Sequence, residues 1–479
     1  MGVKKNFGYN VMITMSSYII GLAIFPYVSR VLGVGLIGRV DFANNVVSYF
    51  SLFALLGVSV VGIREIAYCG DDREKRSRIF SSIFGFIIFL TLISLVLYIL
   101  SIVFVPKFYE YKDLLFLGAL SLFFTPLLIE WLYQGVENFR FIAIRTIIIR
   151  LLYALSVFLL VKEQNDYQIY YILTILTVVI NSFINIYYSK KFVDFKLNYI
   201  ELFKCAKDIV SIGVYKILTS MYTTFNVVFL GYVASDVEVG YYSTSTKLFY
   251  ILLGVFTAFT SVMLPRMSAL LYNNNIEEFK TKIYYSFDLV FMFALPIVIW
   301  SFMYTPQIIM LLSGKGFEGA IVPMRIILPL LFITGIAQII VIQILMPYKK
   351  DRVVLIGSLA GACIGIISNF ALVKIYGAVG TALTLLFAEI VGDFCGFFYV
   401  LNKRIIQFPW RRMLCYFIAS LPYVLLCYLL MQLKLNFILQ LLISAFSCGI
   451  YFLIMNIYIM KNDLIINLLN VIIRYKRNR

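Results

Sequence analysis

Basic side chains interrupt the apolar runs of this sequence, where charge is costly unless it faces water, a partner or a ligand. Five of them form the candidate anion site: Arg30, Arg39, Arg145, Lys216 and Lys247. Arginine binds phosphate oxygens through two parallel hydrogen bonds, and lysine supplies a compact point charge. The set predicts a cationic cavity whose substrate is anionic, and a diphosphate fits that chemistry.

Simpler explanations stay open for some of these side chains. Lys216 lies one turn into its predicted helix, so its long side chain can extend to the membrane surface. Arg325, in another apolar run, has the same alternative at the outer surface. Arg145 and Arg150 are five residues apart, about 140° around a helix, so at most one of them faces the cavity centre.

Four acidic side chains also lie within apolar runs: Glu130, Asp288, Glu389 and Asp393. Glu389 and Asp393 are four residues apart and therefore share one helix face. Two carboxylates on one buried face could hold the proton or sodium ion that couples transport. The alternative is that they pair with a lysine or arginine.

Metal and cofactor chemistry is not expected. The chain has no histidine, and its seven cysteines are scattered without a CxxC pair, which argues against a zinc site. No nucleophile–base pair, acidic DxD site or phosphate-binding glycine loop stands out, so we expect a protein that is not an enzyme. The net charge of +17 sits in short loops between apolar runs, so we expect no nucleic-acid partner.

The elements that position these side chains are membrane helices. The 479 residues are 62% hydrophobic and 14% charged, which predicts an all-α polytopic membrane protein. A bilayer core of about 30 Å needs roughly 20 apolar residues per helix. On this basis we predict about fourteen spans, near 8–29, 40–62, 79–104, 113–134, 141–161, 168–188, 209–234, 241–264, 283–304, 322–346, 354–374, 381–402, 414–433 and 438–460.

Lysine and arginine set the orientation. With the N-terminus inside, about 28 of the 41 basic residues fall in inner segments and about eight in outer ones. Cytoplasmic loops carry this excess, so both termini are expected in the cytoplasm. The basic tail RYKRNR is then expected to anchor that topology.

A faint internal repeat predicts two lobes that run in the same direction. NFGYNVMITM near the start resembles SIGVYKILTS from Ser211, and Ile37–Gly38 corresponds to Val239–Gly240. Parallel repeats of this kind relate the two halves of some transporters. The predicted organisation is an N-lobe at 1–188, an inter-lobe loop at 189–208, a C-lobe at 209–402, and two further helices with a basic tail at 403–479.

Three motifs carry a resemblance to a known family. PYVSRVLG lies where a short segment is expected to link the first two spans, GIREIA ends the second span, and LYQGVENF ends the fourth. Together they resemble the Wzx-type polysaccharide flippases of the multidrug/oligosaccharidyl-lipid/polysaccharide (MOP) exporter superfamily. The resemblance covers nearly the whole chain in length and hydropathy, and the sharp motifs cover about a tenth of it.

The resemblance implies roles for particular residues. Arg30 in SRVLG matches an arginine that is thought to hold the diphosphate, with a structural anchor as its alternative. Arg64 and Glu65 match a family motif. A gate or inter-lobe contact would explain them, and so would a helix-end salt bridge. Asn226 departs from the family pattern, because many relatives carry an aspartate near this point. A coupling site of the family type is therefore in doubt there.

The implied function is movement of an undecaprenyl-diphosphate-linked oligosaccharide to the outer leaflet for O-antigen, capsule or exopolysaccharide synthesis. The implied location is the bacterial inner membrane, with membrane lipids and the pathway's polymerase as partners. An ion gradient or the membrane potential would drive the cycle, by proton or sodium coupling. Open alternatives are a lipid II flippase, a MATE-type cation or drug antiporter, and a pathway polymerase or ligase. The excess of basic residues argues against the antiporter. The short outer loops argue against the polymerase or ligase.

Overall fold

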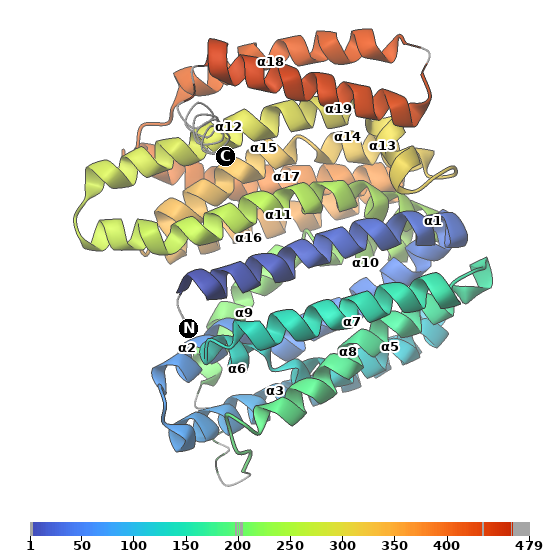
Figure 1. The fold of residues 1–479 in the computed structure, drawn as a ribbon. Helices are drawn as coiled ribbons and strands as arrows, with labels where there is room; N and C mark the ends of the chain where they lie inside the picture. Colours follow the sequence, from blue (N-terminus) through green and yellow to red (C-terminus); the bar gives the residue numbers. More distant parts are fainter. Residues whose placement is uncertain are drawn as a thin grey trace, which may run out of the picture. The chain divides into compact units, whose positions relative to one another are not determined.

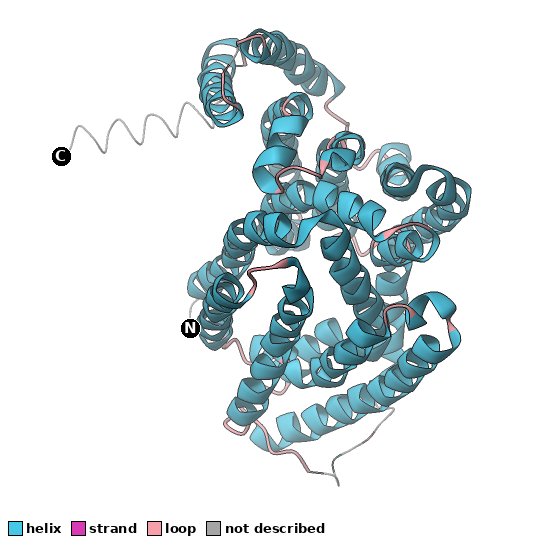
Figure 2. Cartoon of the chain, turned by 90° about the vertical axis from the view of Figure 1, so that its right-hand side faces the viewer, coloured by secondary structure: helices cyan, strands magenta, loops and turns pink. Residues whose placement is uncertain are grey.

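Helices account for almost all of the regular structure. The computed structural model describes residues 3–196, 199, 201, 205–433, 435–460 and 462. Over these ranges the apolar runs are helical and no strand occurs (Figure 2). In lipid, a helix satisfies its own backbone hydrogen bonds, which explains why apolar runs of this length adopt it. The expectation of an all-α chain is confirmed. The basic tail RYKRNR lies outside the described residues.

The first part of the chain contains the elements coloured blue to green in Figure 1. They are α1 (Val3–Leu55), α2 (Val58–Tyr68), α3 (Arg73–Phe104), α4 (Pro106–Tyr109), α5 (Lys112–Phe124), η1 (Thr125–Leu128), α6 (Glu130–Gly135), α7 (Phe139–Leu160), η2 (Gln164–Asp166), α8 (Tyr167–Ser189), α9 (Ala206–Ser220) and α10 (Thr224–Val233).

The second part begins with α11, a helix of 37 residues. Its elements are α11 (Asp236–Tyr272), α12 (Ile276–Met303), α13 (Thr305–Leu312), η4 (Glu318–Ala320), α14 (Ile321–Ile327), α15 (Leu330–Gln338), η5 (Ile339–Leu345), α16 (Asp351–Ser368), η6 (Asn369–Val373), α17 (Lys374–Asn402), α18 (Trp410–Met431), α19 (Phe437–Ile454) and η7 (Met455–Ile459). η5, η6 and η7 are π-helical.

Eleven helical segments of the described chain are long and apolar enough to cross a membrane. Two of them, at 12–68 and 351–402, are long enough to cross twice, and each contains a break. The consecutive short helices α9 and α10 occupy the position of another predicted span. The described residues are therefore consistent with about fourteen crossings.

The link between the first two spans differs from the expectation. The predicted linking segment around Arg30 is helical, and Pro26 lies inside α1. The direction changes at a single residue, Gly33, which has φ +75° and ψ 171°. Only glycine adopts this conformation at little cost. The second helix also differs, because it turns at Leu56, with φ +33°, and resumes as α2, which continues to Tyr68, past the predicted span of 40–62.

The chain packs as two compact units. Unit 1 comprises Met1–Thr244, Leu312–Gly319 and Ser358–Ala388, and unit 2 comprises Ser245–Leu311, Ala320–Gly357 and Glu389–Arg479. Unit 1 therefore includes the first residues of α11, the loop after α13, and the segment around η6. The two predicted lobes, with a boundary near residue 188, stay a prediction.

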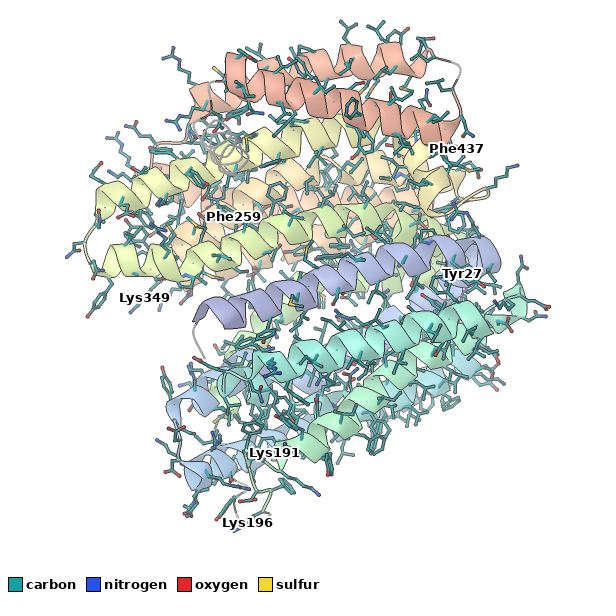
Figure 3. The ribbon with its side chains drawn as sticks, in the orientation of Figure 1. Tyr27, Lys191, Lys196, Phe259, Lys349 and Phe437 are labelled. Carbon is teal, nitrogen blue, oxygen red and sulfur yellow. The ribbon has the colours of Figure 1, made fainter. Side chains whose placement is uncertain are left out.

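In unit 1, α1 packs against α3, α5 and α7, and α2 packs against α6. Glycines allow close approach, since a Cβ at Gly62 would lie 2.6 Å from Trp131 Cε3. Trp131 also stacks on Phe80, with ring centroids 5.5 Å apart. Figure 3 places Lys191 at one end of this unit and Tyr27 towards the other. We call these the Lys191 end and the Tyr27 end.

In unit 2, α12 is the central helix and packs against α15, α18 and α19. The Trp300 indole N–H of α12 donates to Ser444 Oγ of α19 at 3.0 Å. Tyr304, which follows α12, is buried and donates through its hydroxyl to the Cys427 carbonyl at 3.2 Å. Figure 3 places Lys349 and Phe437 at opposite ends of this unit.

Candidate functional site

The two arginines that flank Gly33 differ in their surroundings. Arg30, in the last turn before Gly33, is exposed, and its Nη1 donates to the Pro26 carbonyl at 2.5 Å. Arg39, past Gly33, donates through Nη2 to the Glu110 carbonyl at 3.2 Å, and its guanidinium lies 4.9 Å from the Tyr111 ring centroid. Arg30 therefore presents its guanidinium at the surface of unit 1, while Arg39 is held by the α4–α5 connection.

A set of close contacts joins α1 to the start of α11 at the Tyr27 end. A Cβ at Gly38 would lie 1.8 Å from the Asp236 carbonyl oxygen, so only glycine fits there. The Tyr111 hydroxyl donates to Asp236 Oδ1. Burial and this carboxylate raise the pKa of the Tyr111 hydroxyl, so it stays protonated and able to donate. Glu238 Oε2 accepts from the Ala378 N–H at 2.6 Å, which adds α17 to the same contact set.

Arg145 lies in a buried ionic network. Its Nη2 donates to Glu130 Oε1 at 2.5 Å and to Thr146 Oγ1 at 3.0 Å, and its Nη1 donates to Asn185 Oδ1. Only 4% of the Arg145 side chain is exposed, compared with 42% for Glu130. The network ties α6, α7 and α8 together. Two residues from separate predicted sets, a cavity base and a cavity acid, are thus partners of each other.

Arg150 points elsewhere, as its angular offset from Arg145 predicts. Its Nη1 donates to the Ile13 carbonyl at 2.7 Å and to Ser16 Oγ at 2.8 Å, both on α1. The prediction that these two arginines do not face the same direction is confirmed. Which of them contacts a substrate stays a prediction.

Towards the Lys191 end, the motif GIREIA meets the start of α9. Arg64 donates to Glu65 Oε1 at 3.0 Å and to Asp208 Oδ2 at 2.5 Å. Both residues of the Arg64–Asp208 pair are largely exposed. Lys216, two turns further along α9, donates through Nζ to Ser59 Oγ of α2 at 2.7 Å. Arg64 thus forms ion pairs, as the salt-bridge alternative predicts, and a role as a gate or inter-lobe contact stays a prediction.

The predicted site residues of unit 2 are Lys247, Asp288, Glu389 and Asp393. Asp288 Oδ2 accepts from Arg412 Nη1 at 2.7 Å, so this acid has a cationic partner on α18. Lys247 is partly buried and follows four buried polar residues of α11.

Glu389 and Asp393 lie on one face of α17, as predicted. Within the described part of the chain neither carboxylate forms an ion pair, and Asp393 Oδ2 is buried without a hydrogen-bond partner. Of the four predicted acids, Glu130 and Asp288 are held by arginines, whereas Glu389 and Asp393 form no ion pair in the described ranges. A coupling role for this pair stays a prediction.

The sequence reasoning missed Asp41. Its Oδ2 is buried and has no hydrogen-bond partner among the described residues. Asp41 lies in α1, which packs against α7 and α8, and the Tyr153 hydroxyl of α7 shares a hydrogen bond of 3.2 Å with Thr174 Oγ1 of α8. Asp41 is the only acidic residue between Pro26 and Glu65. This isolated charge in an apolar run could have identified it from the sequence.

Asn226, the predicted departure from the family pattern, is fully buried in α10. Its Oδ1 accepts from Asn369 Nδ2 at 2.7 Å, and its own Nδ2 donates to the Tyr222 carbonyl at 2.7 Å. Asn369 lies in the π-helical η6. Two amides, rather than a carboxylate, therefore occupy this position. Across the described ranges no group of three or more His, Cys, Asp or Glu side chains could hold a metal ion.

A polar cavity of about 490 Å³ opens where α2, α6 and the segment after α8 meet. Its lining includes Asp71, Arg76, Glu137, Asn138 and Phe192. Arg76 is engaged there, because its Nε donates to the Phe192 carbonyl at 3.0 Å. Its lining combines acidic and basic side chains, so this cavity is not a cationic site.

Comparisons with known proteins agree with the resemblance. The chain is 21% identical over 420 residues to a protein of Escherichia coli (strain K12) named "Putative O-antigen transporter", covering 85% of this chain and 98% of the relative. It also resembles the solved structure of a lipid II flippase, MurJ, in an inward closed conformation, with a TM-score of 0.76 and 17% identity over 94% of this chain and 99% of that one.

A second solved structure has the same kind of fold. It is an inward-facing MATE family multidrug resistance transporter of the MOP superfamily, with a TM-score of 0.60 and 18% identity over 84% of this chain and 100% of that one. The expected MOP-type fold is confirmed. Residues 3–271, more than half of the chain, match the family described as polysaccharide biosynthesis protein. The chain belongs to this family of polysaccharide biosynthesis proteins.

Proposed function

We propose that this protein is a flippase that moves an undecaprenyl-diphosphate-linked oligosaccharide from the cytoplasmic to the outer leaflet. The observation that carries the proposal is membership of the polysaccharide biosynthesis family by a chain with a MOP-type transporter fold. The E. coli relative named for O-antigen transport supports the choice of substrate class. The product would supply O-antigen, capsule or exopolysaccharide synthesis, with the pathway's polymerase as the next protein to act.

The proposed mechanism is alternating access, in which the substrate site opens to one membrane face at a time. The sugar-diphosphate head enters the protein while the lipid tail stays in the bilayer. Arg30, an exposed arginine, and Lys247 are the proposed diphosphate ligands, because a guanidinium matches two phosphate oxygens and an ammonium adds charge. Arg39, Arg145 and Lys216 are proposed to add positive potential, and each is hydrogen-bonded within the protein, as Arg30 is.

The proposed driving force is an ion gradient or the membrane potential, with a proton or sodium ion as the coupling ion. Glu389 and Asp393 are the proposed coupling acids, since Glu130 and Asp288 are paired with arginines. The proposed location is the bacterial cytoplasmic membrane with both termini in the cytoplasm. This orientation would place the Tyr27 end of unit 1 at the outer face and the Lys191 end at the inner face.

The test is flipping in proteoliposomes. A fluorescent undecaprenyl-diphosphate oligosaccharide is followed by quenching from the outer face, with and without proton and sodium gradients. We expect protein-dependent movement that responds to one of the gradients. The double variant Arg30→Ala, Lys247→Ala should fold and lose transport, and normal transport by it contradicts the assigned ligands.

A second candidate is a lipid II flippase, which the fold of MurJ favours. Both substrates present a diphosphate, so the arginine chemistry does not separate them. The same assay with fluorescent lipid II compares the flipping rates of the two lipids. The lipid that is moved faster identifies the better substrate. A third arm with a cationic dye tests the antiporter alternative. Efflux of the dye without movement of either lipid contradicts the flippase proposal.

A further inference from the structure

The loop between α13 and η4 lies on the turn of α1 that carries Arg30. Ser29 and Leu312 are 283 residues apart in the sequence, and both belong to unit 1. The Ser29 hydroxyl donates to the Leu312 carbonyl at 3.2 Å, and both residues are buried. The end of α13 is therefore tied to α1 immediately beside the arginine.

Gly314 brings the backbone of this loop against the Arg30 side chain. A Cβ at Gly314 would lie 3.1 Å from Arg30 Cγ, 3.5 Å from Nε and 3.8 Å from Cδ. Gly314 is buried and has φ +86°, a conformation that side-chain-bearing residues rarely adopt. The loop thus lies along the aliphatic stem of Arg30, and the Pro26 carbonyl binds its guanidinium at 2.5 Å.

We propose that Gly314 is a positioning residue for Arg30. Arginine has several rotatable bonds, and a ligand that must first order the side chain loses affinity in doing so. Contact with Gly314 on the stem and with Pro26 at the tip restricts the guanidinium before any ligand arrives. Its exposed edge is then presented to a phosphate group. The inference rests on the proposed function, in which Arg30 binds the diphosphate of the substrate.

Gly316 provides a matched control in the same loop. It has φ +89°, and a Cβ placed there meets no atom within 4 Å. Alanine at either position therefore imposes a similar backbone strain, but only alanine at Gly314 displaces the Arg30 stem. We expect Gly314→Ala to weaken diphosphate binding about tenfold, as for the loss of one charge-assisted hydrogen bond. We expect Gly316→Ala to stay close to the parent protein.

The measurement is isothermal titration calorimetry on the full chain in detergent. The probes are farnesyl diphosphate, inorganic diphosphate and farnesol. Gly314→Ala should weaken both diphosphate probes by the same factor and leave farnesol binding unchanged. Equal weakening of all three probes overturns the positioning role, because it means general damage. Inorganic diphosphate binding as tightly as farnesyl diphosphate overturns the assignment of a lipid headgroup as the ligand.

A double-variant cycle separates this inference from the proposed function. In an Arg30→Ala background, Gly314→Ala should cause no further loss of diphosphate affinity, whereas independent effects would add. An additive result overturns the positioning role. If Arg30→Ala alone leaves the affinity unchanged, the proposed diphosphate role of Arg30 fails instead. When Arg30→Ala weakens binding but Gly314→Ala and Gly316→Ala behave alike, only the positioning role fails.

If Gly314→Ala does not fold, Ser29→Ala provides a second test of the positioning role. This variant changes no glycine and removes the hydroxyl that donates to the Leu312 carbonyl at 3.2 Å and lies 3.3 Å from the Pro26 carbonyl oxygen. We expect it to weaken farnesyl diphosphate binding in the same direction, and we expect the effect to disappear in the Arg30→Ala background. Unchanged affinity in a folded Ser29→Ala protein contradicts the proposal. Thermal unfolding midpoints identify the folded variants.

Discussion

The charge with the most restricted surroundings in unit 1 is Arg145, because its guanidinium is buried and bound by three side chains. Glu130→Ala removes the carboxylate and leaves Arg145 with only neutral partners. We expect this variant to lose about 1–3 kcal/mol of unfolding free energy, since an unsatisfied buried charge keeps its desolvation cost. Chemical unfolding in mixed detergent micelles measures the change.

The cycle of Glu130→Ala with Arg145→Ala shows whether the two residues act as a pair. We expect the double variant to be more stable than the sum of the single effects predicts, with a coupling of about 0.5–3 kcal/mol. Arg140→Ala, at an exposed position in the first turn of α7, is the control and should stay within about 0.5 kcal/mol of the parent. If Arg145→Ala is as stable as the parent but does not flip lipid, the arginine belongs to substrate binding.

The Arg64–Asp208 pair gives the opposite expectation, because both side chains are largely exposed. An exposed ion pair contributes at most about 1 kcal/mol, so Asp208→Ala should change the unfolding free energy little. As a gate contact it should change the flipping rate, and the exchange Arg64→Asp with Asp208→Arg should restore that rate. Flipping in proteoliposomes measures this effect. A rate unaffected by Asp208→Ala leaves the pair as a helix-end salt bridge.

At the scale of helices, glycine determines how closely α2 and α6 approach. Gly62→Ala places a Cβ 2.6 Å from Trp131 Cε3, so the helices must separate, at a cost of about 1–3 kcal/mol. Gly21→Ala, in α1, meets nothing within 4 Å and should stabilise the protein by about 0.5–1 kcal/mol through its better helix propensity. A lower unfolding midpoint for Gly62→Ala together with a higher one for Gly21→Ala supports the close contact. Shifts of the same sign in both variants contradict it.

The helices themselves were predictable, because hydropathy alone locates long apolar runs. Their interruptions were not. Gly33 and Gly377 both break helices with positive φ, at 75° and 52°, but the sequence around each contains other glycines that remain helical. Ile129, with φ +37°, separates η1 from α6 inside a run predicted as one span. No local signal marks it, because the surrounding packing imposes the turn.

At the scale of the whole chain, the ionisable candidates were predictable one by one, because charge in an apolar run stands out. Their pairing was not. Arg145 and Glu130 are 15 residues apart, on two different helices, and Ser29 and Leu312 are 283 residues apart. Such contacts follow from the tertiary packing of helices, and a single sequence contains no direct record of it. The same limit explains why Asp41 was missed, since its burial depends on α7 and α8.

The orientation of the chain can be tested at the two ends of α8. Lys162 and Lys191 are both exposed and lie on either side of this helix. Its 23 residues span about 34 Å, enough to cross the bilayer core. In a variant without the seven native cysteines, Lys162→Cys should react with a membrane-impermeant maleimide on intact spheroplasts. Lys191→Cys should react only after the membrane is permeabilised.

Lys162→Cys and Lys191→Cys serve as controls for each other, because a helix that crosses once allows only one of the two thiols to face outward. Reaction of Lys191→Cys alone inverts the orientation and places the Tyr27 end, with Arg30, in the cytoplasm. Arg30, the proposed diphosphate ligand, would then lie towards the face from which the substrate enters. Reaction of both thiols in intact spheroplasts contradicts a crossing by α8, and with it the even number of spans that places both termini on one side.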